Sequence, residues 1–118
     1  MQANLADQTC IPCKGGVPPL TAAEIAPLRA QLDGWDVPDD KRLKRTFRVK
    51  NFAEALALAN RIGAIAEEQQ HHPDLYVAWG RVGVEVWTHK IDGLTESDFV
   101  FAAKCDRAYT EDRAAAST

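Results

Sequence analysis

The chain has 118 residues, of which 46% are hydrophobic and 26% charged, and its formal net charge is −3. These values are typical of one soluble globular domain and argue against disorder and against direct nucleic-acid binding through a basic surface. The longest apolar stretches are far shorter than the about 20 residues that cross a bilayer, and residues 1–10 lack the regions of a signal peptide. We therefore expect a cytoplasmic protein without a membrane partner.

Residues 1–20 are rich in turn-forming residues and show no hydrophobic period, which predicts a flexible N-terminal arm. Cys10 and Cys13 form a C-x-x-C in this arm, and Cys105 stands alone. A structural zinc site needs four ligands, and no second Cys or His pair stands at a suitable spacing. The glycines and prolines after Cys13 do not fit the helix that follows a redox C-x-x-C. We expect two reduced thiols, with metal capture or redox sensing as the open alternatives.

Three helices are predicted in the single domain that we expect over residues 21–113, ahead of a short tail at 114–118. Each helix begins at a capping pattern, in which side chains satisfy backbone N–H groups of the first turn. The patterns are Thr21-x-x-Glu24, Asn51-x-x-Glu54 and Thr95-x-x-Asp98. The helices are expected over about residues 21–32, 52–70 and 96–113.

The second of these helices has an amphipathic pattern. We place on its core face Phe52, Leu56, Ala59, Ile62, Gly63 and Ala66. The helix is expected to end before Pro73, because proline disfavours the α conformation at His72 and has no N–H to donate.

Between the helices the apolar residues alternate with polar ones, as in half-buried strands. Strands are expected at Trp35–Val37, Leu43–Val49, Asp74–Trp79 and Arg81–His89. The resulting order, α-β-β-α-β-β-α, predicts an α+β fold: a four-stranded antiparallel sheet with three helices on one face.

The last expected strand separates a core face from an open face. Val82, Val84, Val86 and Thr88 point toward the core, whereas Trp87 and His89 point the other way. An indole on a face that no helix covers predicts a ligand pocket, a subunit interface, or both.

All three histidines, His71, His72 and His89, lie within nineteen positions. A single histidine at a helix or strand end is often only a cap or a surface residue. Here Glu67 stands four residues before His71, so the carboxylate and the imidazole share a helix face, an arrangement that fixes the tautomer and raises basicity. The three imidazoles are therefore candidates for proton transfer.

Two other chemistries fit these residues less well. Adjacent histidines such as His71 and His72 rarely converge on one ion, so we expect no metal site. Nucleophilic catalysis needs a Ser or Cys beside the base, and no such turn is visible.

The histidine run also carries a resemblance to a known family. Glu67-x-x-x-His71-His72-Pro73, followed by Trp79, His89 and Asp98 at fixed spacings, resembles the signature of the pterin-4a-carbinolamine dehydratases. The pairs Gly34-Trp35 and Thr88-His89 and the run Gly93-Leu94-Thr95-Glu96 agree with the same pattern. The resemblance covers about residues 20–113.

The resemblance implies dehydration of 4a-hydroxytetrahydropterin to the quinonoid dihydropterin, without a metal or organic cofactor. His72 and His89 are expected to transfer the protons, one to the leaving hydroxide and one from N5 of the pterin, because imidazoles hold either role near neutral pH. His71, braced by Glu67, is expected to bind or polarise the pterin, and a share in the proton transfers stays open. Pro73 and Thr88 are expected to line the pocket.

Two further expectations concern the site. Asp98 is interpreted mainly as a helix cap, because its N3 position explains it without chemistry. Trp87 departs from what is expected of well-studied animal members of the family, in which a small residue precedes the Thr-His pair. It could narrow the pocket, stack on a pterin or contact another subunit.

The expected partners are a pterin substrate and further copies of the chain, as a homodimer or homotetramer. The alternative function is non-catalytic, because the family includes proteins that act as binding partners. These are an assembly factor for the carbon-fixing carboxylase in carboxysome bacteria and a transcriptional cofactor.

Overall fold

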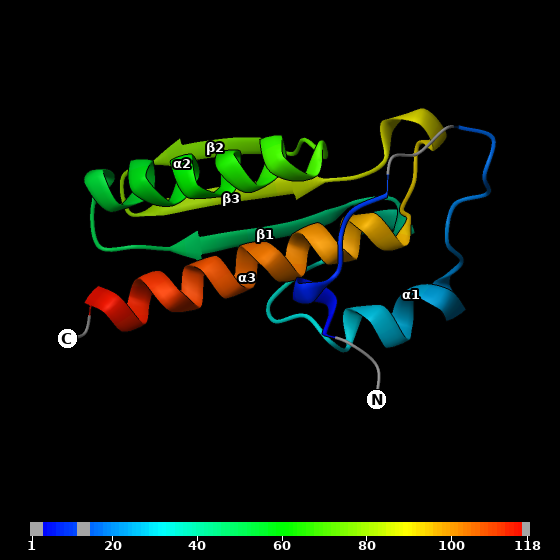
Figure 1. The fold of residues 1–118 in the computed structure, drawn as a ribbon, viewed down its shortest axis with the longest axis horizontal. Helices are drawn as coiled ribbons and strands as arrows, with labels where there is room; N and C mark the ends of the chain where they lie inside the picture. Colours follow the sequence, from blue (N-terminus) through cyan, green and yellow to red (C-terminus); the bar gives the residue numbers. More distant parts are fainter. Residues whose placement is uncertain (1–3, 12–14, 117–118) are drawn as a thin grey trace.

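The computed structural model describes residues 4–11 and 15–116 (Figure 1). Its elements follow the order η1 (Leu5–Asp7), α1 (Ala22–Arg29), η2 (Pro38–Asp40), β1 (Leu43–Arg48), α2 (Phe52–Gln69), β2 (Asp74–Ala78), β3 (Arg81–Val86), η3 (His89–Ile91) and α3 (Glu96–Ala116). None of the described helices is long and apolar enough to cross a membrane.

The three predicted capping patterns are confirmed. The Thr21 hydroxyl accepts from the Glu24 N–H, and the Glu24 carboxylate accepts from the Thr21 N–H. The Asn51 side chain accepts from the N–H of Glu54 at 2.9 Å. At α3 the Asp98 carboxylate accepts from the N–H of Thr95, also at 2.9 Å.

The sheet has three antiparallel strands in the order β1-β3-β2, so the predicted four-stranded sheet is wrong, although the α+β class holds. Asp36 forms a single bridge with Lys44 in place of a strand over residues 35–37. Pro38 then begins a turn of 3-10 helix, and Asp39 and Asp40 both have φ of 56°. A proline without an N–H, followed by two left-handed residues, turns the backbone away from β1 before a second bridge can form.

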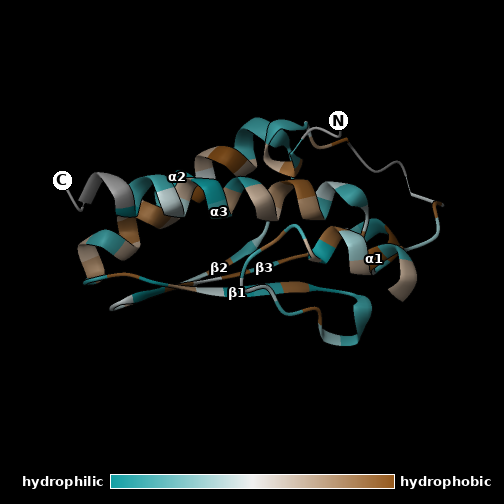
Figure 2. Cartoon of the chain, turned by 90° about the horizontal axis from the view of Figure 1, so that it is seen from below, coloured by the Kyte–Doolittle hydropathy of each residue, from teal (hydrophilic) through white to brown (hydrophobic). Residues whose placement is uncertain are grey.

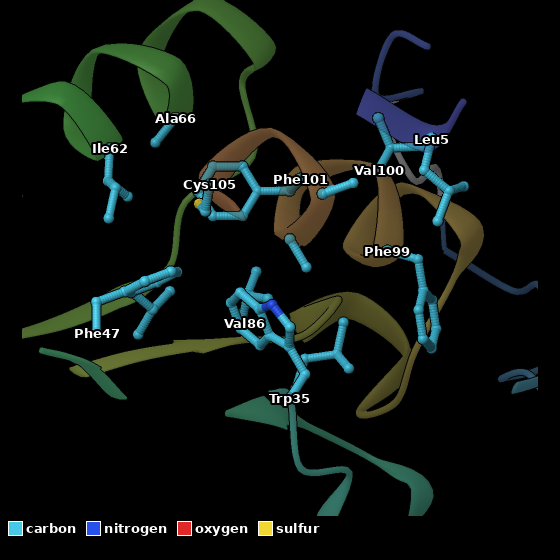
Figure 3. Packing of buried hydrophobic residues seen from close by; sticks show 14 of the residues in the cluster. Leu5, Trp35, Phe47, Ile62, Ala66, Val86, Phe99, Val100, Phe101 and Cys105 are labelled. Carbon is cyan, nitrogen blue, oxygen red and sulfur yellow. The ribbon is translucent and has the colours of Figure 1, made fainter. Parts of the chain in front are cut away.

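The helices α2 and α3 lie across one face of the sheet, and α1 contacts α3 (Figure 2). The core lies between these layers (Figure 3). Val82, Val84 and Val86 on β3 are buried, as their alternation predicts. They pack with a cluster drawn from the helices and β1, which includes Leu43, Phe47, Ile62, Phe99 and Phe101.

The predicted core face of α2 is rotated in the structure. Ala55, Leu58, Ile62 and Ala66 are the residues that it buries. Phe52 and Leu56, which we expected in the core, are 45% and 44% exposed. The small side chains of Ala55 and Ala66 let α2 pack closely against α3 and the sheet. The larger Phe52 and Leu56 lie to one side of this contact.

Part of the predicted N-terminal arm, residues 4–11, lies against α3. We refer to it as the N-terminal segment. Leu5 is buried in the core near Val100 (Figure 3), and Cys10 is buried as well. The carbonyl of Ala6 accepts from Lys104 at 2.9 Å and from Arg107 at 2.8 Å. Cys13, the second thiol of the C-x-x-C, lies outside the described residues.

Candidate active site

The end of α2 determines where the first two histidines lie. The helix ends at Gln69, and Gln70 takes a left-handed conformation with φ of 54°. The N–H of His71 then donates back to the carbonyl of Ala66 at 3.1 Å, which closes the helix end. His71 is therefore no longer one helical turn from Glu67.

This helix end changes the predicted pairing of the histidines. Glu67 Oε2 lies 2.6 Å from Nε2 of His72, not of His71. The Glu67 and His72 side chains are 76% and 57% exposed, so water screens their pair. His71 turns inward instead, and Nε2 of His71 lies 2.6 Å from Oδ1 of Asp98.

Asp98 is fully buried and joins three segments of the chain. Its Oδ1 contacts His71, while its Oδ2 accepts from the Thr88 hydroxyl at 2.7 Å and from the Thr95 N–H at 2.9 Å. The predicted helix cap is therefore confirmed but is one of three contacts. The signal that could have revealed the others is the place of Asp98 in the spaced pattern with the histidines.

The contacts of Asp98 also indicate the tautomer of His71. Two donors already occupy Oδ2, which suits an ionised carboxylate that accepts at both oxygens. The neutral His71 ring then carries its proton on Nε2 and donates it to Asp98, which leaves Nδ1 with a free lone pair. An imidazole held in this way by a buried carboxylate can bind or take a proton at the other nitrogen.

The end of β3 positions the third histidine. Thr88 is buried, as its register predicts, and its N–H donates to the carbonyl of Gly93 at 2.8 Å. The strand itself ends at Val86, earlier than expected, and His89 begins the exposed turn η3. Because Thr88 is bonded to Asp98, the carboxylate that holds His71 also holds the residue next to His89.

Trp87 packs against the ring of His89. The two ring centroids are 4.3 Å apart at an interplanar angle of 44°. The guanidinium of Arg42 lies over the same indole, 4.2 Å from its centroid, and donates to Asp92 at 3.1 Å. The hydrogen bond from Arg42 and the charge of Lys41 lower the pKa of Asp92, so this carboxylate stays ionised beside the stack.

The structure thus brings together most, but not all, of the predicted site. His71, Asp98 and Thr88 form one hydrogen-bonded group. His89 is the next residue after Thr88 in the chain, and His72, the next residue after His71, pairs with Glu67 near the end of α2. Pro73, next to His72, is half-buried. Trp79, which belongs to the same sequence pattern, lies beyond the other end of β2 and is 72% exposed.

Two other features lie apart from the histidines. A hollow of about 860 Å³ opens on the uncovered face of the sheet over Thr46, Tyr76 and Gly83, and no histidine lines it. Among residues 4–11 and 15–116, no three His, Cys, Asp or Glu side chains gather as ligands for a metal ion.

Comparison with known proteins decides the family. The family model for pterin 4 alpha carbinolamine dehydratase matches residues 18–108. The chain belongs to this family. It is 60% identical over 105 residues to a protein of Rubrobacter xylanophilus named "Putative pterin-4-alpha-carbinolamine dehydratase", covering 89% of this chain and 98% of that one. A protein of the same name from Alkaliphilus metalliredigens is 52% identical over 109 residues, covering 92% and 98%.

Solved structures agree with the fold. A transcriptional coactivator/pterin dehydratase from Brucella melitensis matches with a TM-score of 0.72 and 33% identity, over 77% of this chain and 98% of that chain. A pterin dehydratase-like protein identified as a RuBisCO assembly factor in the alpha-carboxysome matches with a TM-score of 0.57 and 20% identity, over 65% and 90%. The second likeness concerns the fold alone.

Proposed function

We propose that this member of the family is a working enzyme that dehydrates 4a-hydroxytetrahydropterin to the quinonoid dihydropterin and water. The observation that carries the proposal is the buried carboxylate of Asp98, which binds His71 and Thr88 and so links the end of α2 to the residue before His89. A buried carboxylate is costly to desolvate, and holding His71 and Thr88 in fixed positions for catalysis is a reason to keep one here.

The reaction needs one proton donor and one proton acceptor. The hydroxyl on C4a leaves as water once it is protonated, and the N5–H bond gives its electrons to the new N5=C4a double bond as the proton departs. His72 suits the acceptor, because the Glu67 carboxylate at 2.6 Å stabilises the imidazolium that forms. His89, exposed and stacked on Trp87, suits the donor.

His71 has a different part in this proposal. Its Nε2 is bonded to Asp98, so the ring is fixed and only Nδ1 is available to the substrate. We assign it to binding and polarising the pterin ring. Pro73 and Thr88 lie next to His72 and His89 in the chain and would form part of the pocket wall.

The test is the decay of 4a-hydroxytetrahydropterin, followed by its ultraviolet absorbance. The purified protein should accelerate the decay, and His72→Ala and His89→Ala should each lose about 10²-fold or more of that acceleration. A wild-type rate equal to that of buffer would show that the protein is not this enzyme.

The second candidate is a role as a binding partner. The Brucella relative at 33% identity is described as both a coactivator and a dehydratase, so the two roles can belong to one protein. Exposed Tyr76 and Trp79 on and after the edge strand β2 would suit such a contact. This candidate gains support if the dehydratase assay is negative while the protein is folded.

Self-association is also proposed. Within the described residues β2 pairs only with β3, so its other edge keeps free backbone donors and acceptors. A second copy can pair with that edge in antiparallel fashion, covering Val77 and Trp79, which are 38% and 72% exposed. Light scattering should report a dimer or tetramer, and a 13.0 kDa monomer would contradict the proposal.

A further inference from the structure

The N-terminal segment crosses the two helix ends that form the active site. Cys10 and Ile11 lie between Gln69, the last residue of α2, and Ser97, in the first turn of α3. Gln69 stands two residues before His71, and Ser97 stands directly before Asp98.

Hydrogen bonds join the segment to both helix ends. Gln69 Oε1 accepts from the N–H of Cys10 at 2.9 Å. The Ser97 hydroxyl accepts from the N–H of Ile11 at 2.8 Å and donates to the carbonyl of Ile11 at 3.1 Å. The Cys10 thiol donates to the backbone carbonyl of Ser97 at 3.4 Å.

These hydrogen bonds can keep the N-terminal segment and the two helix ends in fixed relative positions. Ser97 and Cys10 are only 7% and 6% exposed, so water replaces their bonds poorly if they are broken. The backbone groups of Cys10 and Ile11 come from a segment that is anchored again further along α3, where Arg107 donates to Asp7 at 2.6 Å. The segment is therefore held at both ends.

We propose that the N-terminal segment is a positioning element of the active site, with Ser97 and Gln69 as its contact residues. By bonding to α2 and α3 at once, it fixes the distance between these helix ends and hence the contact of His71 with Asp98. This role rests on the proposed function insofar as it concerns catalysis, since the His71–Asp98 pair is the part of the site that it holds.

The test compares Ser97→Ala with Ser97→Thr in the full chain. Alanine removes both bonds to Ile11, while threonine keeps the hydroxyl. We expect Ser97→Ala to lower kcat about tenfold with little change in KM, because small misplacement of catalytic groups is costly. Ser97→Thr should retain most of the rate. Gln69→Ala should act in the same direction as Ser97→Ala, and Gln31→Ala, in the exposed turn after α1, should leave the rate unchanged.

A second readout does not depend on turnover. In the wild type the Nε2 proton of His71, bonded to Asp98, should give a downfield imidazole N–H resonance in proton NMR at low temperature. Ser97→Ala and Gln69→Ala should broaden or shift this resonance, and Ser97→Thr and Gln31→Ala should not. If Ser97→Ala fails to fold, Gln69→Ala provides the same comparison.

The outcomes separate the two proposals. A wild type that shows the His71 N–H resonance but no dehydratase activity overturns the proposed function. In that case a broadened or shifted His71 resonance in Ser97→Ala and Gln69→Ala still supports the positioning role, and an unchanged resonance overturns it. An active wild type whose Ser97→Ala and Gln69→Ala variants keep both the kcat and the His71 resonance overturns the positioning role.

Discussion

Nε2 of His71 and Oδ1 of Asp98 meet at 2.6 Å although the two residues are 27 positions apart in the chain. Asp98 is fully buried at this contact, whereas the side chain of His71 keeps 14% of its surface exposed. The buried carboxylate therefore orients the ring, and the exposed part of the ring is where a substrate would reach it. If the proposed function holds, the chemistry of the site depends on a carboxylate that a substrate would not touch.

Replacing Asp98 by asparagine tests this dependence. Asparagine keeps the shape of the side chain but removes the charge that favours the Nε2–H tautomer of His71. We expect kcat for pterin dehydration to fall by about 10- to 100-fold, with a smaller change in KM. Steady-state kinetics at neutral pH measures both values.

The control for Asp98 is the cap of α1, where the Thr21 side chain bonds to Glu24. Thr21→Ala removes the cap of α1 and should cost about 1 kcal/mol of unfolding free energy without lowering kcat. Asp98→Ala, which removes a cap and the carboxylate bonded to His71 and Thr88, should cost about 2–4 kcal/mol. Wild-type turnover by Asp98→Asn would show that the buried carboxylate has only a structural role.

The pair of Glu67 and His72 predicts a smaller effect. Both side chains are mainly exposed, and such ion pairs contribute only about 0.2–1 kcal/mol. Converted by RT, this energy means that Glu67→Gln should lower the dehydration rate by about 1.4- to 5-fold. The assay is the same absorbance decay, run on both variants at one pH.

Glu68→Gln is the matched control for this change. Glu68 is the next residue on α2 and is also exposed, and its glutamine variant keeps an oxygen that can accept from the Gln69 side chain. It should retain the wild-type rate. Equal rates for Glu67→Gln and Glu68→Gln would show that Glu67 takes no part in the proton transfers.

Much of the site could be predicted because the signals are local in the chain. The alternation of Val82, Val84, Val86 and Thr88 depends only on the pleat of a strand, and it placed Thr88 correctly on the buried side. The cap at Asp98 follows from its distance to Thr95 in the sequence. The partner of Asp98 across the fold, His71, depends on tertiary packing that no local pattern records.

The errors have an equally physical origin. Pairing Glu67 with His71 assumes that the helix continues through His71, but the helix ends at Gln69 because Gln70 is left-handed. The predicted core face of α2 was correct at Ile62 and Ala66 but wrong at Phe52 and Leu56, because close packing buries Ala55 and Leu58 instead. The fourth strand failed because one bridge, between Asp36 and Lys44, precedes a proline turn.

Trp87 yields a prediction that separates a supporting role from an obstructing one. If its indole orients His89 at 4.3 Å, Trp87→Ala should lower kcat about tenfold, and Trp87→Phe should recover part of the loss by restoring an aromatic face. Kinetics on the two variants gives kcat and KM separately. A lower KM together with an unchanged or higher kcat in Trp87→Ala would show that the indole obstructs the pocket instead.

Cys10 predicts how stability changes at high pH. Burial raises the pKa of its thiol from 9.0 to about 11, with the charge of Lys104 acting in the opposite direction. The folded protein therefore keeps this thiol protonated over a range in which the unfolded chain has already lost the proton. The contribution is fully present below pH 9 and is lost as the pH rises through about 11.

The measurement is the difference in unfolding free energy between the wild type and Cys10→Ala, taken by urea denaturation at several values from pH 8 to pH 10.5. Groups other than Cys10, including the buried Cys105, titrate in both proteins, so their effects cancel in the difference. We expect the advantage of the wild type to shrink steadily above pH 9, because only the unfolded wild type gains a thiolate at this position. A difference that stays constant across this range would mean that the thiol is open to water in the folded protein, and that the N-terminal segment does not remain closed over Ser97.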